Sequence, residues 1–284
     1  MIEIHLLEQL AAFAEHGTLS EAAEKLHTSQ PALTRSMKKL EQELGVSLFI
    51  RSKNHLALNE TGVHAAEYAR RVLDADREWA AQVRAYDRSL HTLSIGFCAP
   101  IPQMVLTPII NDVFEGMTIS ADMTDDRDFM KKLESGNYQL AVTHYQVDNE
   151  RFYCKKIGHE DLYISVPPGH PLAASSEIHL SDLDGLSILL LQRIGFWTHV
   201  REKTPNSRYL LQIEQDSFAE LAENSRYPIF SSSYNIHRNN VIPGRLDIPV
   251  VDAECHTDFY LICLASEQKR YAPLLKRVGD TTIV

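Results

Sequence analysis

The sequence has no apolar run that approaches the roughly 18 residues a membrane-spanning helix needs. It has little glycine and proline, 12 of each in 284 residues, which excludes a collagen-like or low-complexity chain. The first residues, Met1 to His5, lack the basic segment of a signal peptide. The four cysteines are scattered and form no C-x-x-C pair, as is usual in a reducing cytosol. We therefore expect a cytoplasmic protein that does not interact with a membrane.

Basic charge is scarce as well. The chain has 28 Lys and Arg against 38 Asp and Glu, and its net charge of −10 excludes a surface coated with basic patches. Any contact with nucleic acid must then be local. Residues 19–55 meet this condition, because six basic side chains against four acidic ones give the stretch a charge of +2. The acidic remainder would discourage unspecific adhesion of nucleic acid elsewhere.

Signatures of common catalytic sites are also missing. There is no G-x-S-x-G, G-x-G-x-x-G, P-loop or H-E-x-x-H motif, and the 13 histidines do not pair at metal-ligand spacing. We therefore expect no enzyme, no metal and no resident cofactor; an enzyme with an appended DNA-binding domain is the alternative from another class. What is present is ordinary for a soluble globular protein, with 44% hydrophobic and 23% charged residues. A length of 284 residues favours two or more domains.

Two short helices separated by a polar turn are predicted between Leu19 and Gly45. The first covers residues 20–26, the turn is 27–29, and the second helix runs over 30–44. Ser29 is a good N-cap, Pro31 sits in the first turn where its missing N–H costs nothing, and Gly45 is a natural stop. This arrangement is typical of a helix-turn-helix that reads DNA, although the pattern is degenerate and also fits an ordinary surface helix.

The second of these helices has two different faces. Leu33, Met37, Leu40 and Leu44 recur at spacings of 4, 3 and 4, which predicts one buried stripe. The opposite face carries side chains that can bond base edges and phosphates. They are Gln30, Thr34, Arg35 and Lys38.

Further elements extend this small domain. Residues 2–16 are expected to form an amphipathic helix, and residues 46–58 form two short apolar runs around the polar tip 52–55. The second pattern predicts a β-hairpin, the wing of a winged helix. Arg51 and Lys53 would then lie near a phosphate backbone; a plain hairpin loop is the alternative.

A long helix over residues 61–88 follows, and it carries apolar side chains at alternating spacings of 4 and 3. This spacing is a heptad seam with one polar break at Asp76, which favours a helix–helix dimer contact. Packing of the helix on its own domain is the alternative. The predicted dimerisation positions are Ala65, Val72, Trp79, Val83 and Tyr86.

From His91 the pattern changes to alternating strands and helices, the arrangement of a mostly parallel sheet flanked by helices. The expected strands cover 93–97, 117–123, 139–143, 162–166, 187–191, 210–214, 229–230 and 259–265. The expected helices cover 103–115, 126–135, 180–183, a stretch from 196, 217–224 and 269–278.

At this point the chain resembles the LysR-type transcriptional regulators over essentially its whole length. The most specific match lies between Leu19 and Gly62, where residues 19–34 and 40–51 follow the family signature nearly residue for residue. Residues 58–62 stand where the family usually has a Leu-Thr-x-x-Gly start to its linker helix, with Asn59 in place of the Thr. The rest is similar more loosely: residues 93–96 resemble the first strand of the effector domain, 133–142 its L-x-x-G-x-x-D-x-A element with Gln139 in place of Asp, and 170–173 its HPLA turn.

The resemblance implies an α/β protein with an N-terminal winged helix-turn-helix and a two-lobed effector domain like a periplasmic binding protein. The expected parts are the DNA-binding domain 1–59, the linker and dimerisation helix 60–90, and the effector-binding domain 91–284. The first lobe would hold 91–160 and 266–284, and the second 161–265. The implied partners are a double-stranded DNA operator, a small-molecule effector of unknown identity, and further copies in a homodimer or homotetramer. Contact with RNA polymerase is compatible with this role.

Site residues follow for both functions. Gln30 and Arg35 would contact base edges, and Pro31 and Ala32 a thymine methyl group. The phosphate contacts would come from Ser20, Ser29, Thr34, Lys38, Arg51 and Lys53.

The effector would lie between the lobes, where strand ends and helix starts converge. Its expected contacts are Cys98, Ala99, Pro100, Ile101, Thr143, His144, Phe196, Trp197, Ser231 and Ser232. One stretch departs from the family: residues 225–233 read SRYPIFSSS where relatives often carry a glycine-rich segment.

A redox-sensing regulator of the same family is the closest alternative, because some relatives sense peroxide through a cysteine pair. Cys255 and Cys263 are eight residues apart in this chain. Cys263, however, lies in the apolar run 259–264, which predicts a buried and inert thiol.

Overall fold

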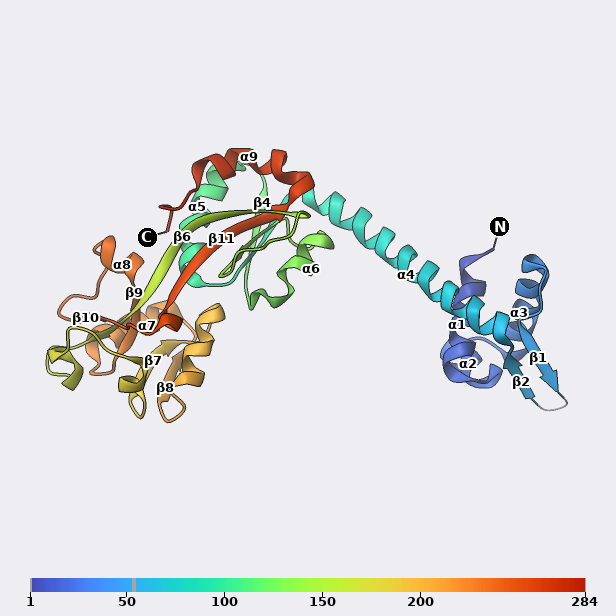
Figure 1. Cartoon of the computed structure of the whole chain (residues 1–284), viewed down its shortest axis with the longest axis horizontal. Helices are drawn as coiled ribbons and strands as arrows, with labels where there is room; N and C mark the ends of the chain where they lie inside the picture. Colours follow the sequence, from blue (N-terminus) through green and yellow to red (C-terminus); the bar gives the residue numbers. More distant parts are fainter. Residues whose placement is uncertain (1, 53–54, 284) are drawn as a thin grey trace. The chain divides into compact units, whose positions relative to one another are not determined.

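The computed structural model describes residues 2–52 and 55–283 and contains two compact units, Met1–Arg84 and Ala85–Val284. The first unit is built of three helices, a β-hairpin and the first part of a long helix that continues into the second unit (Figure 1). Its elements are α1 (Ile4–His16), α2 (Leu19–Lys25), α3 (Gln30–Leu44), β1 (Phe49–Ser52), β2 (His55–Leu58) and α4 (Glu60–Ser89).

Local side-chain contacts explain where the helices of this unit begin and end. The hydroxyl of Thr18 accepts the N–H of Glu21 at 3.2 Å and starts α2. The hydroxyl of Ser29 accepts the N–H of Ala32 at 3.3 Å and starts α3. Gly45 ends α3 in the left-handed conformation, with φ 71°. The predicted helix-turn-helix is therefore present, with its predicted cap and stop.

The core of the first unit collects the apolar faces of all its elements. Leu33, Met37 and Leu40 are buried in it, whereas Leu44 is 39% exposed because it lies in the last turn of α3, beyond the packed elements. The buried stripe is therefore one residue shorter than expected. The carboxylate of Glu41 accepts the backbone N–H of Leu48 at 2.8 Å and so fastens the hairpin to α3.

The second unit is a curled mixed sheet covered by helices (Figure 1). Its strands are β3 (Thr92–Phe97), β4 (Thr118–Met123), β5 (Leu140–Thr143), β6 (Phe152–Val166), β7 (Ser187–Leu191), β8 (Arg208–Gln212), β9 (Ile229–Ser232), β10 (Leu246–Pro249) and β11 (His256–Leu264). Its α-helices are α5 (Pro100–Val113), α6 (Phe129–Glu134), α7 (Gln215–Asn224), α8 (Ser233–His237) and α9 (Gln268–Arg277). Short 3-10 turns are η1 (Asp126–Asp128), η2 (Pro171–Ala174), η3 (Leu180–Leu183), η4 (Gly195–Lys203), η5 (Ala253–Cys255) and η6 (Ala265–Glu267).

The strand order is β4-β3-β5-β11-β6-β9-β7-β8, with β10 paired to β6. Strands β3, β4 and β5 run parallel, as do β7, β8 and β9. The long strand β6 belongs to both groups, because its first half pairs with β11 and its second half with β9 and β10. We call the part around β3, β4, β5 and β11 the first lobe, and the part around β7, β8, β9 and β10 the second lobe.

Two features of this sheet differ from the sequence expectation. The strand expected at 162–166 begins ten residues earlier, since residues 152–161 pair with β11. The expected division puts the strand 259–265 in the second lobe, whereas β11 pairs with β5 and belongs to the sheet of the first lobe. No helix within the described ranges is both long and apolar enough to cross a membrane.

Candidate nucleic-acid interface and ligand pockets

The outer face of α3 carries positively charged side chains that are not paired with other described residues of the unit. Gln30, Arg35 and Lys38 are exposed, and neither Arg35 nor Lys38 has a hydrogen bond or ion pair with any described residue. Lys39 is different, because its ammonium contacts Glu3 at 2.8 Å and Glu43 at 3.8 Å. Two of the three cations on this helix can therefore meet an external anion without first breaking an internal contact.

The other predicted DNA contacts lie around this face. Ser20, Ser29 and Pro31 are exposed, and Ala32 and Thr34 are partly exposed. The hydroxyl of Thr34 donates to the carbonyl of Gln30 at 2.9 Å, so it offers an external partner mainly its acceptor side. Arg51 is in β1, where the structure describes the strand but not the side chain, and Lys53 lies outside the described residues.

The predicted seam on α4 divides into a covered and an exposed part. Ala65 packs against the core of the first unit, and the neighbouring seam residue Ala69 is buried in it. The later seam positions are exposed: Val72 46%, Trp79 67%, Val83 52% and Tyr86 66%. Exposed large apolar side chains repeated at helical spacing form a stripe suited to a second helix.

In the second unit, two pockets lie where the lobes meet. The polar pocket has a volume of about 1040 Å³ and is lined by the chain after β4 and β5 and by residues of η4. The apolar pocket has a volume of about 900 Å³ and is lined by α5, the ends of β7 and β9, and the middle of β6. Met123 and Ile194 line both, so the two pockets adjoin there.

The lobes touch directly beside these shared residues. The backbone N–H of Phe196, in the second lobe, donates to the carbonyl of Cys98, in the first, at 2.8 Å. The contact depends on Gly195, which has φ +62°, because a Cβ added there would lie 1.9 Å from the same carbonyl oxygen. A glycine at the start of η4 thus permits this close backbone approach between the lobes.

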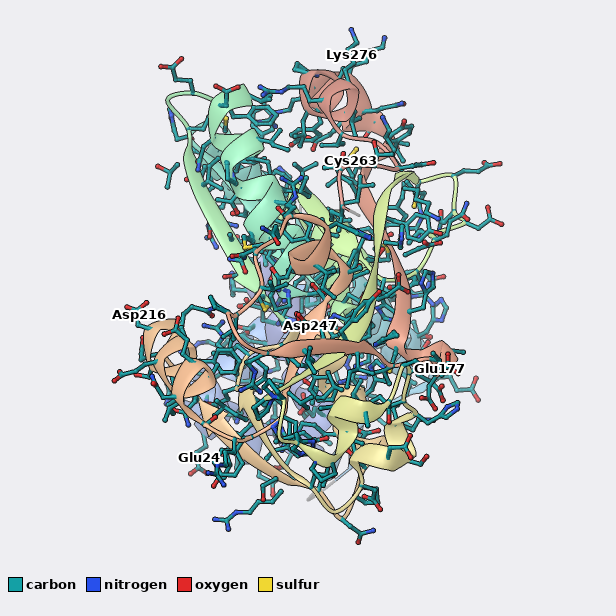
Figure 2. The ribbon with its side chains drawn as sticks, turned by 90° about the vertical axis from the view of Figure 1, so that its left-hand side faces the viewer. Glu24, Glu177, Asp216, Asp247, Cys263 and Lys276 are labelled. Atoms are coloured by element: carbon teal, nitrogen blue, oxygen red, sulfur yellow. The ribbon has the colours of Figure 1, made fainter. Side chains whose placement is uncertain are left out.

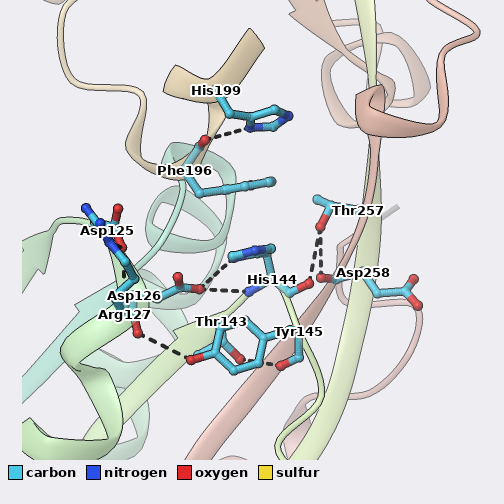
Figure 3. A network of polar contacts seen from close by, with 10 residues as sticks. All are labelled: Asp125, Asp126, Arg127, Thr143, His144, Tyr145, Phe196, His199, Thr257 and Asp258. Atoms are coloured by element: carbon cyan, nitrogen blue, oxygen red, sulfur yellow. Dashed lines mark hydrogen bonds and ion pairs between the residues drawn. The ribbon is translucent and has the colours of Figure 1, made fainter. Parts of the chain in front are cut away.

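The polar pocket contains an aromatic stack that also bridges the lobes. Figure 3 shows the ring of Phe196 between those of His144 and His199. The His144 and Phe196 rings are parallel within 5°, with centroids 4.5 Å apart. Asp126, which is 2% exposed, holds His144 in place: its Oδ2 lies 2.7 Å from Nδ1 and accepts the backbone N–H at 3.2 Å.

The apolar pocket contains one deeply buried carboxyl group. Glu160 is 3% exposed, and its Oε2 accepts the indole N–H of Trp197 at 3.1 Å. Burial raises the pKa of this carboxyl to about 7, although the Trp197 hydrogen bond and the nearby hydroxyl of Ser232 lower it in part. The Ser232 oxygen is close enough to act on the charge but lies outside hydrogen-bonding geometry. A second carboxyl, Asp247, lies on β10 (Figure 2).

The ten predicted effector contacts fall into three groups. Pro100, Ile101, Trp197, Ser231 and Ser232 line the apolar pocket, and His144 and Phe196 line the polar one. The remaining three, Cys98, Ala99 and Thr143, are fully buried and line neither.

Cys98 and Thr143 do not line a pocket because their polar groups already form hydrogen bonds within the protein. The Cys98 carbonyl already accepts Phe196, and the Thr143 hydroxyl donates to the carbonyl of Tyr145 at 2.7 Å.

Glu160 is the main residue that the sequence reasoning did not single out. A signal was present, because Glu160, Leu162 and Ile164 alternate along one strand, and period two places a charged residue on the same face as two apolar ones. Charged residues are rarely buried, so a charged residue on a buried face of a strand is a sign of a functional site.

The four thiols are poorly placed for redox chemistry. All are free, and Cys98, Cys255 and Cys263 are buried. Burial raises the pKa of all four, that of Cys98 well above its usual value and those of Cys255 and Cys263 to about 12. The thiolate that reacts with peroxide is therefore scarce at neutral pH.

Two protein-family models match the chain. One, described as a bacterial regulatory helix-turn-helix protein of the lysR family, matches residues 4–63. The other, a LysR substrate binding domain, matches residues 87–272. The first match covers the helix-turn-helix with its wing, and the second covers most of the two-lobed unit.

Individual relatives point the same way. The hydrogen peroxide-inducible genes activator of Dickeya chrysanthemi is 29% identical over 197 residues, which are 67% of this chain and 64% of the relative. The RuBisCO operon transcriptional regulator of Allochromatium vinosum is 27% identical over 185 residues, 64% of this chain and 61% of the relative. The chain thus spans a little under two thirds of the length of these curated relatives. Both are named as regulators of genes.

One solved structure supports the fold assignment. A full-length OxyR variant from Pseudomonas aeruginosa superposes with a TM-score of 0.50 at 21% identity, covering 98% of this chain and 99% of that chain. A likeness at this identity concerns the fold alone.

Proposed function

Because the chain belongs to the LysR family of bacterial helix-turn-helix regulators, we propose that it is a sequence-specific DNA-binding transcriptional regulator controlled by a small molecule bound in its two-lobed unit. The observation that carries the first half is the outer face of α3. Arg35 and Lys38 are exposed and unpaired among the described residues, in a chain whose net charge is −10. Cations kept free in an acidic protein fit a phosphate-rich partner.

The proposed roles along α3 follow from reach and chemistry. Gln30 and Arg35 would form bidentate hydrogen bonds with adenine or guanine edges, while Pro31 and Ala32 contact a thymine methyl group. Phosphate contacts position the protein without reading sequence, and we assign them to Ser20, Ser29, Thr34, Lys38, Arg51 and Lys53.

The exposed stripe on α4 supports pairing of two copies. Two α3 helices related by a two-fold axis would read a dyad-symmetric operator with half-sites about one helical turn apart. We propose a homodimer of this kind, with a homotetramer as the full assembly. The working division of the chain is 1–59 for DNA, 60–90 for dimerisation and 91–284 for the effector.

The pockets between the lobes support the regulatory half of the proposal. A ligand that binds there with different affinity in two lobe arrangements would shift the population of one arrangement. The regulator would act in the cytoplasm, where its operator is accessible, and RNA polymerase is the partner we propose for its effect on transcription.

The proposal is tested by a footprint on the DNA that flanks the protein's own gene. On the protected segment, Arg35→Ala should cost about 1–3 kcal/mol of binding free energy and relax the choice of sequence. Lys39→Ala is the matched control, since it removes the same charge from the same helix but from a side chain that Glu3 already holds. Absence of a footprint would reject the regulator, and an equal loss by Arg35→Ala on random DNA would reject base reading.

Peroxide sensing is the second candidate, favoured by the name of the Dickeya relative. The burial and raised pKa values of the thiols weigh against it. We therefore place control in the ligand pockets.

A further inference from the structure

The apolar pocket has a carboxyl group in its wall that lacks a cation. Glu160 is 3% exposed and forms no ion pair with any described residue; it accepts a hydrogen bond from the indole N–H of Trp197, and the Ser232 hydroxyl lies nearby. A buried carboxylate without a cation is costly to keep ionised. A residue of this kind in a pocket wall is well suited to a ligand that supplies the missing positive charge.

The other charged residues that line the pocket do not pair with Glu160, which also favours a cationic ligand. Among the described residues that line it, the charged ones are two carboxyls, Glu160 and Asp247, and one cation, Arg201. The guanidinium of Arg201 lies over the ring of Tyr209, 5.2 Å from its centroid. Asp247 also has a cation nearby, because the guanidinium of Arg245, which does not line the pocket, interacts with its charge. Glu160 is therefore the lining carboxyl without a cation, and an anionic ligand would approach a buried carboxylate of its own sign.

Two further polar groups in the same wall have unused capacity. The hydroxyl oxygens of Ser165 and Ser232 are buried and have no hydrogen-bond partner among the described residues. Both residues line the pocket. Buried hydroxyls are normally bonded, so both have free capacity for polar groups of a ligand. Ser232 pairs with Leu162 and therefore lies near Glu160, whereas Ser165 is five residues farther along β6 and would serve another part of the ligand.

The remainder of the wall is apolar. Met104, Leu162 and Phe218 are among its lining residues, and its volume of about 900 Å³ is large enough for a compact organic molecule. The lining of the pocket is therefore complementary to a ligand with an apolar body and one positively charged end.

We propose that the effector of this protein is an apolar organic cation, a primary amine whose ammonium group pairs with Glu160 while its body fills the apolar pocket. This rests on the proposed function in so far as it makes this pocket the regulatory site. The ammonium donates to the free Oε1 of Glu160 and the Ser232 hydroxyl, and Trp197 keeps its bond to Oε2.

The test is isothermal titration of the full-length protein at pH 8 with three amines, phenethylamine, tryptamine and hexylamine, and with three carboxylates of similar shape, phenylpropionate, indolepropionate and hexanoate. We expect at least one amine to bind about tenfold or more tightly than its matched carboxylate. Binding of a carboxylate with equal or higher affinity, or no binding by any of the amines, would overturn the proposal.

Two variants test whether the ammonium group of the ligand pairs with Glu160. Glu160→Gln keeps the shape of the side chain and removes the carboxylate, so amine binding should weaken about tenfold or more. Asp161→Asn makes the same change one residue along β6, where the carboxylate contacts His256 at 2.6 Å and does not line the apolar pocket. It should bind the amine within a factor of about three of the parent, and equal losses in both variants would contradict a specific ion pair.

The pH dependence of amine affinity is a further test, because that affinity would not change with pH if Glu160 had only a structural role. Burial and, to a smaller extent, the neighbouring Asp161 carboxylate raise the pKa of Glu160 to about 7, against the lowering effect of Trp197 and Ser232. The affinity of the parent for the amine should therefore fall about tenfold from pH 8 to pH 6 as the carboxyl becomes protonated. Glu160→Gln should show a flat profile. The operator footprint of the ligand-free parent is measured separately, so that a failed titration with an intact footprint rejects the ligand class and leaves the regulator standing.

Discussion

The indole N–H of Trp197 donates to Oε2 of Glu160 across 3.1 Å, and both side chains are buried. One bond to a neutral donor does not offset the loss of water around a carboxylate, which is why the pKa of Glu160 rises to about 7. The folded state therefore favours the protonated carboxyl. This preference links the stability of the protein to pH.

Glu160→Gln should stabilise the protein at high pH and change little at low pH. The carboxyl has a higher pKa folded than unfolded, so its favourable contribution is complete below about pH 4.5 and is lost as pH rises through about 7. The gain from Gln should therefore grow between these pH values, toward an upper limit on the order of 3 kcal/mol. Urea unfolding at pH 5 and pH 8 measures it, and an equal effect at both pH values would contradict the raised pKa.

Gly195→Ala should destabilise the contact between the lobes. The new Cβ would meet the Cys98 carbonyl at 1.9 Å, and φ +62° is strained for any L side chain. We expect a loss of roughly 2 kcal/mol or more in the free energy of unfolding.

Gly185→Ala separates the two causes of that loss, because Gly185 also has a positive φ, +85°, but nothing lies within 4 Å of its added Cβ. This control should lose only about 1 kcal/mol. Equal losses in both variants would mean that the approach to Cys98 has no cost of its own.

The two units differ in how much the sequence could predict. The helix-turn-helix is specified locally, since Ser29 caps α3, Gly45 ends it, and Leu33 to Leu40 mark its buried face within a few turns. These signals need no knowledge of distant contacts, and the structure confirms them.

The pockets depend on long-range pairing that no local pattern contains. Residues 152–161 carry several charges and become a strand only by pairing with β11, a hundred residues away. Cys98 and Thr143 lie at strand ends, where ligands usually bind, but backbone contacts to Phe196 and Tyr145 bury them. Which strand ends remain open is decided by how the loops of the two lobes meet.

The stripe on α4 should hold two copies together. Replacing Trp79 and Val83 by Glu puts two charges on its exposed apolar positions, which are 67% and 52% accessible in one copy. A charge at a helix–helix seam loses hydration without gaining a partner, so we expect a shift toward monomer. Sedimentation velocity at micromolar concentration measures the shift.

Arg77→Glu is the control for this experiment, because it adds negative charge to the same helix at a position outside the stripe. It should leave the mass unchanged. An unchanged mass in the double variant as well would place the contact between copies elsewhere.

Mild peroxide should leave all four thiols reduced, because burial raises their pKa values and keeps the reactive thiolate scarce. Cys255 directly precedes β11 and Cys263 lies near the other end of that strand, on the order of 25 Å away at the rise of a strand, so the two cannot join without unfolding it. Mass spectrometry after brief treatment should show no disulfide, and the footprint should be unchanged. A linked peptide pair would instead return the peroxide-sensing candidate to first place.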